Sequence, residues 1–179
     1  MRIAIVGSSG SGKTTLARAV HERTGIPHVE MDALHHLAGW QPNPSFRNDL
    51  SAALDQPTWV CDGNYSIAED DVRSAADTIV VFDLPRRTVM RQLLARTLRR
   101  GITRHELWNG NREKLTNIFR RDPRRNILLW SWKHHEGYRA RYAAAARSGG
   151  WDHADVVRIG SHADADTWLT TLRTRTEGD

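Results

Sequence analysis

The residues best suited to chemistry stand near the start of the chain, in the segment GSSGSGKTT at residues 7–15. Its glycines allow backbone conformations that side chains forbid, so that successive N–H groups can point at one anion. Lys13 adds a positive charge for the outer phosphates of a nucleotide, and the hydroxyl of Thr14 can ligate Mg²⁺. We therefore expect a phosphate-binding loop for a nucleoside triphosphate with Mg²⁺, made by Gly7, Ser8, Ser9, Gly10, Ser11, Gly12, Lys13, Thr14 and Thr15.

The elements on either side of this segment are those that a phosphate-binding loop requires. Residues 2–6, RIAIV, form a short apolar run that is typical of a strand buried on both faces of a parallel sheet. Residues 13–24 have the apolar periodicity of a helix, and Gly25 follows as a C-cap. Residues 7–14 match G-x-x-x-x-G-K-[ST] between this strand and this helix, which favours a binding loop over a flexible turn.

The rest of the chain alternates strands with helices. We expect strands that end at Asp32 and Asp62, and two more within residues 76–85 and 154–159. Helices are expected in four places: residues 44–57, the segment after Pro85 with an apolar stripe of Val89, Leu93, Leu94 and Leu98, most of 104–147 with a break near Asp122-Pro123, and 163–175. This order predicts one α/β domain over residues 1–179, with a five-stranded parallel sheet and helices on both faces.

The charge of the chain is unevenly distributed. The formal net charge is +5, but residues 86–125 hold twelve arginines and Lys114 against three acidic residues, so this segment is +10 and the remainder is −5. Such a block must meet phosphates, nucleic acid or acidic side chains of the same fold. No apolar stretch approaches the roughly 18 residues of a membrane helix. Together with the single cysteine, Cys61, which we expect to be buried in a strand, this predicts a cytoplasmic protein.

Two carboxylates are expected beside the loop. Asp62 ends the third strand, where its side chain would face the loop, and a turn-forming role before Gly63 is the alternative. Asp83, at the end of the fourth strand, is a rival, although its DLPR segment is equally typical of a helix start. Asp32 ends the second strand, at the crevice where doubly wound sheets bind ligands, and a helix cap is its alternative.

The order of these motifs resembles a known family. The glycine-rich loop, MDAL, WVCDGNY, ADTIVVFDLPR and the arginine-rich segment are similar to the adenylate kinase-related P-loop kinases, and closer still to the bacterial topology modulation (FlaR-like) proteins, over about residues 1–135. The resemblance implies ATP as phosphoryl donor, Mg²⁺ held at Thr14 and Asp62, and Asp32 beside the phosphate acceptor. It also implies that the loop after the fifth strand packs against adenine, with Gly160, Ser161 and His162 as candidates.

The same resemblance gives the arginine-rich segment, about residues 96–125, a role as a helical lid. In these kinases such arginines close over ATP and stabilise charge on the transferring phosphoryl group. We therefore expect Arg96 and Arg100 to be catalytic together with Lys13 and Asp32, and a solvated helix face is the alternative. The other arginines that could belong to the lid are Arg99, Arg104, Arg120, Arg121, Arg124 and Arg125.

These expectations favour an ATP-dependent phosphotransferase. The chain lacks the Asn-Lys-x-Asp motif of GTPases and the length of motor ATPases. Adenylate kinases follow their Asp-Gly motif with a Pro-Arg that clamps the acceptor phosphate, whereas here Asn64 and Tyr65 follow. A small hydroxyl-bearing acceptor is therefore favoured over a nucleotide, although Arg47 or Arg73 could replace the clamp. Trp40 and Tyr65 are candidates to line the acceptor pocket.

A function of another class remains open. The +10 segment would also suit a nucleic-acid-binding regulator that uses ATP as a switch. Aromatic residues interleaved with the arginines would favour it, because single strands are gripped by stacking as well as by charge. Only Trp108 and Phe119 qualify, so this function ranks second. The His35-His36 and His134-His135 pairs have no catalytic partner in the sequence and are interpreted as surface or packing residues.

Overall fold

The computed structural model describes residues 1–123 and 126–173. Its centre is a sheet of parallel strands in the order β2-β3-β1-β4-β5, which confirms the predicted five-stranded parallel sheet. The strands are β1 (Arg2–Gly7), β2 (His28–Glu30), β3 (Trp59–Asp62), β4 (Thr78–Phe82) and β5 (Asp155–Ile159). The expectation that β2 ends at Asp32 is wrong, because helix α2 begins at Met31 and contains Asp32.

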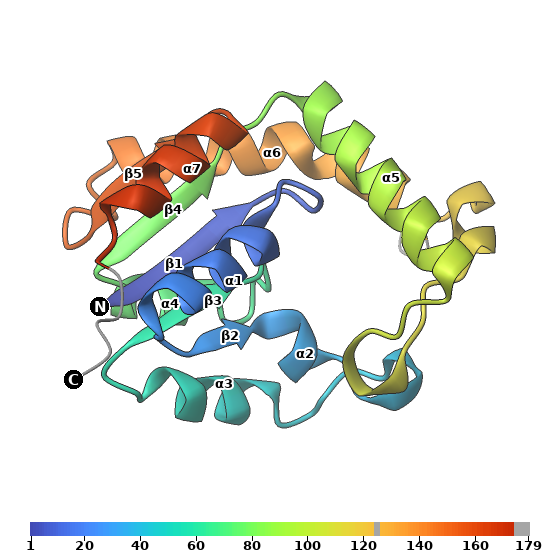
Figure 1. Cartoon of the computed structure of the whole chain (residues 1–179), viewed down its shortest axis with the longest axis horizontal. Helices are drawn as coiled ribbons and strands as arrows, with labels where there is room; N and C mark the ends of the chain where they lie inside the picture. The colour runs from blue at the N-terminus through green and yellow to red at the C-terminus, as the bar shows by residue number, and fades with distance from the viewer. Residues whose placement is uncertain (124–125, 174–179) are drawn as a thin grey trace.

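Helices cover the sheet on both faces, as the sequence predicts (Figure 1). The α-helices are α1 (Lys13–Thr24), α2 (Met31–His35), α3 (Phe46–Leu54), α4 (Glu69–Ala75), α5 (Arg86–Thr103), α6 (Ile127–Arg147) and α7 (His162–Thr171). Three 3₁₀ turns accompany them, η1 (Ala38–Trp40), η2 (Trp108–Gly110) and η3 (Leu115–Phe119). Helix α4 was not foreseen.

The two faces follow from the alternation of side chains along the buried strands. Ala4 and Val6 of β1 belong to a core shared with α3, α4 and α6. Ile3 and Ile5, which point to the other face, belong to a core shared with α1, α5 and α7. The continuous apolar run RIAIV therefore has a partner layer on each side, which fixes β1 and the loop that follows it.

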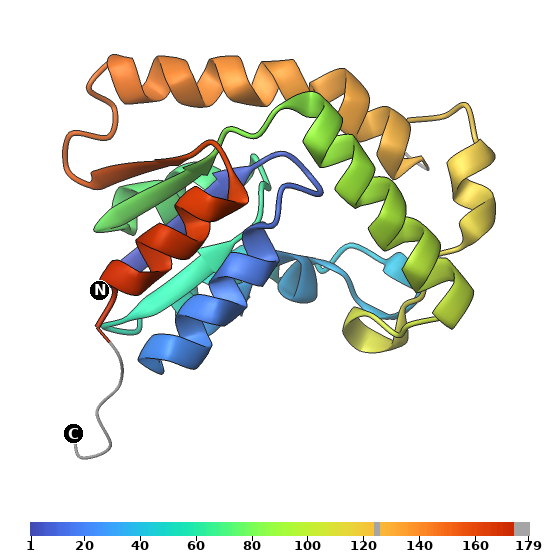
Figure 2. The same cartoon turned by 45° about the horizontal axis from the view of Figure 1, so that its top comes forward.

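The arginine-rich segment differs from the predicted helical lid. Helix α5 ends at Thr103, and the next long helix, α6, begins at Ile127. Between them the described residues form turns and the short η2 and η3, which lie at the far end of α5, away from the sheet (Figure 2). Asn126 caps α6 by accepting hydrogen bonds from the backbone N–H groups of Leu128 and Leu129, so the expected helix over 104–147 is wrong before this cap.

Only part of the expected apolar stripe of α5 is buried. Val89 and Leu93 are fully buried, and Thr97 continues their face one turn later. Leu94 and Leu98 are 42% and 37% exposed, so their placement in the stripe is wrong. The expected buried position of Cys61 is found in β3, where burial raises the pKa of its thiol. None of the described helices combines the length and apolar character that crossing a membrane requires.

Candidate active site

The loop after β1 takes backbone conformations that its glycines permit. Gly7, Gly10 and Gly12 have φ angles of 149°, 86° and 105°, which other residues rarely adopt. A Cβ on Gly7 would lie 2.7 Å from the Cβ of Phe82, and one on Gly10 would lie 2.8 Å from the Cβ of Leu93. The glycines thus let the loop pack directly on β4 and α5. Helix α1 begins immediately after it, with the positive end of its dipole at the loop.

Lys13 folds back over this loop. Its Nζ donates hydrogen bonds to the carbonyl oxygens of Gly7 at 2.8 Å and Ser8 at 3.0 Å. Burial lowers the pKa of Lys13 to about 8, although the nearby carboxylates of Asp62 and Asp32 raise it. A bound phosphate would supply the negative charge that a buried ammonium group lacks. Lys13 therefore has both the position and the electrostatic character of a phosphate ligand.

Thr14 and Asp62, the two expected magnesium ligands, are in direct contact. Thr14 Oγ1 donates a hydrogen bond of 2.6 Å to Asp62 Oδ2, and Asp62 is buried at the end of β3. Asp62 Oδ1 lies 2.7 Å from Nε2 of His28, on the neighbouring strand β2. A hydroxyl and a buried carboxylate beside the loop fit Mg²⁺, which prefers oxygen ligands. His28 was missed because one sequence does not reveal which strand lies beside β3.

Asp83, the rival of Asp62, has other partners. Its carboxylate accepts hydrogen bonds from Arg139 of α6 and Arg158 of β5. Burial raises the pKa of Asp83, but the two guanidinium groups outweigh burial and lower it. These ion pairs join three elements, which is a structural role.

Asp32 lies in the first turn of α2, in contact with Tyr65. The hydroxyl of Tyr65 donates a hydrogen bond of 2.6 Å to Asp32 Oδ1 and lies 3.1 Å from His36 Nε2. The charge of Asp32 raises the pKa values of Lys13 and Arg96 against the effect of their burial. Three of the four residues expected to be catalytic, Lys13, Asp32 and Arg96, therefore interact electrostatically. His36, which the sequence suggests is a surface or packing residue, packs on the rings of Trp40 and Trp108 and also lies within hydrogen-bond distance of Tyr65.

The two lid arginines expected to be catalytic differ in their surroundings. Nε of Arg96 is buried and has no hydrogen-bond partner among the described residues. Burial and the neighbouring charge of Arg100 lower the pKa of Arg96, whereas Glu113 and Asp32 raise it. Arg100 is paired with Glu113 at 2.9 Å. Arg96 is thus available to a ligand, whereas Arg100 joins α5 to the segment that follows.

The remaining arginines expected in the lid are exposed where the structure describes them. They are Arg99, Arg104, Arg120 and Arg121. Arg124 and Arg125 lie outside the described residues.

Residues 105–112, which we call the lid turn, dock on the segment that follows α2. The side chain of Asn111 is buried, where it accepts a hydrogen bond of 2.8 Å from Trp40 N and donates one of 2.9 Å to Leu37 O. Asn109 Nδ2 donates to His36 O at 2.6 Å. The lid turn therefore contacts the segment directly after α2, the helix that carries Asp32. Nothing in one sequence indicates these pairings.

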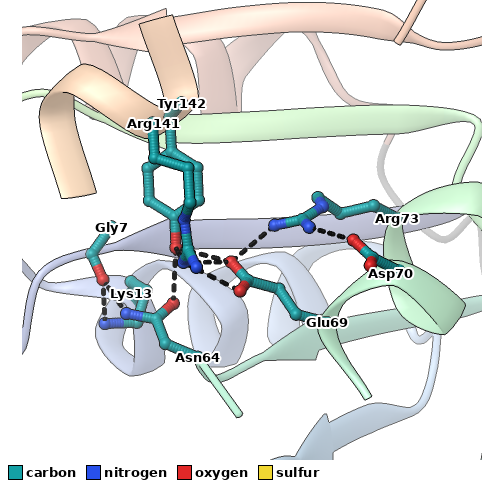
Figure 3. A network of polar contacts seen from close by, with 8 residues as sticks. All are labelled: Gly7, Lys13, Asn64, Glu69, Asp70, Arg73, Arg141 and Tyr142. Carbon is teal, nitrogen blue, oxygen red and sulfur yellow. Dashed lines mark hydrogen bonds and ion pairs between the residues drawn. The ribbon is translucent and has the colours of Figure 1, made fainter. Parts of the chain in front are cut away.

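A buried polar network supports the loop from the side of α4 and α6 (Figure 3). Asn64 of the GNY segment donates to Gly7 O, and the hydroxyl of Tyr142 lies 3.3 Å from Asn64 Oδ1 and 2.8 Å from Glu69 Oε1. Glu69 is buried and forms ion pairs with Arg73 and Arg141. Asn64 therefore holds the loop in place.

Both arginines suggested as replacements for the missing acceptor clamp are paired with carboxylates of α4. Arg73 is committed to Glu69 and Asp70, as Figure 3 shows. Arg47 lies 2.8 Å from Asp71, on the outer surface between α3 and α4. These pairs disfavour the suggestion that either one binds an acceptor phosphate, which stays a prediction.

Helix α6 adds a second support beneath the loop. Ser131 Oγ donates to Ser9 O at 3.2 Å, and one turn later His135 Nδ1 lies 3.2 Å from Ser8 Oγ. Both α6 side chains are buried, and burial lowers the pKa of His135. Of the two adjacent histidines, His134 is exposed, whereas His135 packs on the loop. Its four-residue spacing from Ser131 was the available signal for a shared helix face.

Ser161 caps helix α7. Its Oγ accepts a hydrogen bond from Asp164 N at 3.2 Å, while Asp164 Oδ2 accepts one of 2.9 Å from Ser161 N. This reciprocal pair is a capping box. The next residue, His162, reaches the loop, because its Cε1 would lie 3.7 Å from a Cβ on Gly12. The segment expected to pack against adenine therefore lies beside the phosphate loop, and the Ser161 hydroxyl is occupied by the helix cap.

Comparisons with known proteins give structural likenesses. The chain is similar to a gluconokinase from Sinorhizobium meliloti 1021, with 19% identity, a TM-score of 0.49 and coverage of 96% of this chain and 92% of that one. It is also similar to a shikimate kinase from Bacteroides thetaiotaomicron, with 14% identity, a TM-score of 0.49 and coverage of 96% and 95%. A sugar kinase from a Janibacter species gives 14% identity, a TM-score of 0.44 and coverage of 94% and 92%.

No family model and no curated protein matches the sequence. The resemblance to the topology modulation proteins therefore stays a prediction, and the function proposed below rests on the residues of this chain.

Buried polar atoms without partners gather around the loop and the lid. Among the described residues they are Ser11 Oγ, His35 Nδ1, His36 Nδ1, Arg96 Nε, Thr97 Oγ1, Glu113 Oε2 and His135 Nε2. Native proteins satisfy most buried polar groups, so each of these atoms needs a partner that the described residues do not supply. They lie on the loop, on α2 and the residue after it, on α5 and the segment that follows it, and on α6.

Proposed function

We propose that the protein is an ATP-dependent kinase that transfers the γ-phosphoryl group of Mg·ATP to a hydroxyl group of a small acceptor. The observation that carries this proposal is the attachment of Asp32 to the loop: its partner Tyr65 follows Asn64, which donates to Gly7 O, so the carboxylate is tied to the segment that would bind the phosphates. A phosphate loop alone serves many functions, whereas phosphoryl transfer also needs a group for the acceptor.

The loop residues would hold the donor. Backbone N–H groups after β1 and the N-terminus of α1 bind the phosphates, and Lys13 exchanges its two carbonyl partners for phosphate oxygens. Thr14 and Asp62 would hold Mg²⁺, which neutralises charge on the β- and γ-phosphates when it is bound. The guanidinium group of Arg96 meets the charge that develops on the transferring group.

The acceptor would bind beside Asp32. A hydroxyl must lose its proton as it attacks phosphorus, and Asp32 is the carboxylate that would take it or orient it. A phosphate acceptor would need a cationic clamp instead, but Arg47 and Arg73 are committed to Asp71 and Glu69. This contrast favours a hydroxyl-bearing small molecule over a nucleotide.

A screen of acceptors with Mg·ATP tests the proposal. The panel contains sugars, sugar acids, hydroxy acids, nucleosides and nucleotides, and the products are identified by mass spectrometry. We expect stoichiometric formation of ADP and one phosphorylated hydroxyl compound. Mg·ATP at 100 times its dissociation constant should add about 2.7 kcal/mol to the free energy of unfolding. A thermal-shift assay that finds no such stabilisation would contradict the proposal, because nucleotide binding is its first step.

A nucleic-acid-binding regulator is the second candidate. It is favoured by the exposed arginines at 99, 104, 120 and 121 and by Phe119, which is 83% exposed and directly precedes Arg120 in the chain. An exposed aromatic ring among cations is suited to stacking on an unpaired base. This candidate would use the outside of the lid, and the kinase would use the inside.

A further inference from the structure

Tyr65 connects two polar residues of α2 and its C-terminal end. Its ring is stacked on His35, with centroids 4.2 Å apart, and also contacts Phe46 at 5.2 Å. Its hydroxyl lies 2.6 Å from Asp32 Oδ1 and 3.1 Å from His36 Nε2. Packing therefore fixes the ring, and the hydroxyl is held between a carboxylate and an imidazole.

Counting protons determines the direction of both hydrogen bonds. Burial and the charge of Asp32 raise the pKa of Tyr65, so that its hydroxyl keeps its one proton, which it donates to Asp32. The oxygen of Tyr65 can then only accept from His36, which requires that His36 Nε2 carries a hydrogen. Burial lowers the pKa of His36, so the ring is neutral and Nδ1 is bare. His36 Nδ1 is indeed buried without a partner among the described residues.

We infer that Tyr65 and His36 are positioning residues that hold Oδ1 of Asp32 through two successive hydrogen bonds and leave Oδ2 to take the proton of the acceptor hydroxyl. This inference rests on the proposed kinase function. In the transfer, the acceptor O–H bond breaks and its proton goes to Oδ2, while the acceptor oxygen forms a bond to the γ-phosphorus. The bond from that phosphorus to the bridging oxygen breaks, and its electron pair leaves on ADP.

The far end of this chain of hydrogen bonds is held by the lid turn. Asn109 donates to the backbone oxygen of His36 at 2.6 Å, and the ring of Trp108 is stacked with that of His36 at 6.2 Å. The ring of Trp40 makes an edge-to-face contact with the same imidazole, with centroids 5.2 Å apart. The orientation of His36 therefore depends on the lid turn. Through Tyr65, the position of the lid turn in turn affects the orientation of Asp32.

Replacing Tyr65 by Phe keeps the aromatic ring and removes its one hydrogen bond to Oδ1 of Asp32. The variant therefore tests the orientation of this carboxylate apart from the packing of the ring on His35 and Phe46.

The first measurement needs no acceptor. Long-range ¹H–¹⁵N NMR on the full chain reports which ring nitrogen of each histidine carries hydrogen. We expect neutral His36 with hydrogen on Nε2 at neutral pH, and a change in its ring signals in Tyr65→Phe but not in Tyr138→Phe. Tyr138→Phe is the matched control, because it also removes a tyrosine hydroxyl. Tyr138 lies on α6, where its ring contacts Trp130, and the described residues show no contact between it and Asp32. Hydrogen on Nδ1, or a charged ring, would overturn the inference.

The second measurement is steady-state kinetics with the acceptor that the screen identifies. Tyr65→Phe should lower kcat at least ~10-fold, a part of the ~10²–10⁴ that a general base contributes, with the Kd for Mg·ATP unchanged. The acceptor KM should change little, and Tyr138→Phe should keep the wild-type kcat. His36→Gln, which keeps an N–H donor, should retain more activity than His36→Leu.

The outcomes separate this inference from the proposed function. If wild type phosphorylates no acceptor, the kinase proposal fails, while the NMR result still decides whether the two hydrogen bonds exist. If wild type is an active kinase but Tyr65→Phe has the wild-type kcat, the positioning role is refuted and the kinase proposal stands. An effect confined to the acceptor KM would also refute it, because it would show binding without control of Asp32.

Discussion

The protonation state of Lys13 gives a prediction that reports on the nucleotide site without any acceptor. The pKa of Lys13 is lowered to about 8, chiefly by burial, so that about half of the free protein carries a neutral lysine at pH 8. The negative phosphates of Mg·ATP favour the charged form and raise this pKa. Binding at pH 8 should therefore take up roughly 0.5 proton per site, and less than about 0.1 at pH 7.

The sign of the affinity change follows from the same shift. Below pH 8 the lysine is already charged in the free protein, so affinity is flat with respect to this group. Above pH 8 each bound nucleotide must first recover a proton, so the Kd rises up to ~10-fold per pH unit until the pKa of the complex is reached. Isothermal titration calorimetry in buffers of different ionisation enthalpy measures the proton uptake directly.

The matched control is a second lysine. Lys13→Met should abolish the buffer dependence at pH 8, whereas Lys133→Met, which changes an exposed residue of α6, should keep it. The reasoning would be refuted if wild type bound Mg·ATP at pH 8 with no proton uptake. It would also be refuted if Lys13→Met showed the same uptake as wild type.

Three further predictions concern the loop, the lid turn and the lid surface. Gly10→Ala should reduce the free energy of unfolding by ~2–5 kcal/mol, because the residue has a positive φ and a Cβ there would meet Leu93. The matched Gly110→Ala, at a similar φ of 78° but with open space around it, should lose only ~1–2 kcal/mol, and chemical denaturation measures both values. Asn111→Ala removes two hydrogen bonds of the lid turn and should raise the acceptor KM in steady-state kinetics while calorimetry finds the Kd for Mg·ATP unchanged; equal weakening of both would show that the lid turn serves the nucleotide. We expect the exposed arginines at 99, 104, 120 and 121 to bind DNA only through general charge attraction. Fluorescence anisotropy should then find DNA binding that does not respond to ATP and falls steeply with salt, whereas tight, ATP-dependent binding at physiological salt would favour the regulator.

The parts of the fold that could be predicted are encoded locally. The loop and its flanking elements occupy consecutive residues, and the glycine positions are set by the backbone conformation itself. The position of Asp62 was also predictable, because the carboxyl ends of parallel strands meet at one edge of the sheet. Its contact with Thr14 follows from β1 and β3 being neighbours.

The parts that were missed depend on contacts between distant segments. His28 and His135 look ordinary in the sequence, and only the neighbouring strand and the packing of α6 bring them to Asp62 and Ser8. The lid was predicted to be helical because the segment resembles that of the P-loop kinases, but Asn109-Gly110 is a turn signal, and both residues adopt positive φ. Local turn chemistry there outweighed the expectation from the resemblance.

The most direct test of the kinase proposal is the fate of the γ-phosphoryl group. Wild type, Asp32→Asn and Lys13→Ala are each incubated with Mg²⁺ and γ-labelled ATP over the hydroxyl-bearing panel, and binding of unlabelled Mg·ATP is titrated in parallel. We expect wild type to move the label to one acceptor, and Asp32→Asn to bind Mg·ATP normally while transferring at least ~10²-fold more slowly. Lys13→Ala should remain folded and lose most transfer. Label that moves from ATP only to water, or an Asp32→Asn variant with wild-type transfer, would contradict the account.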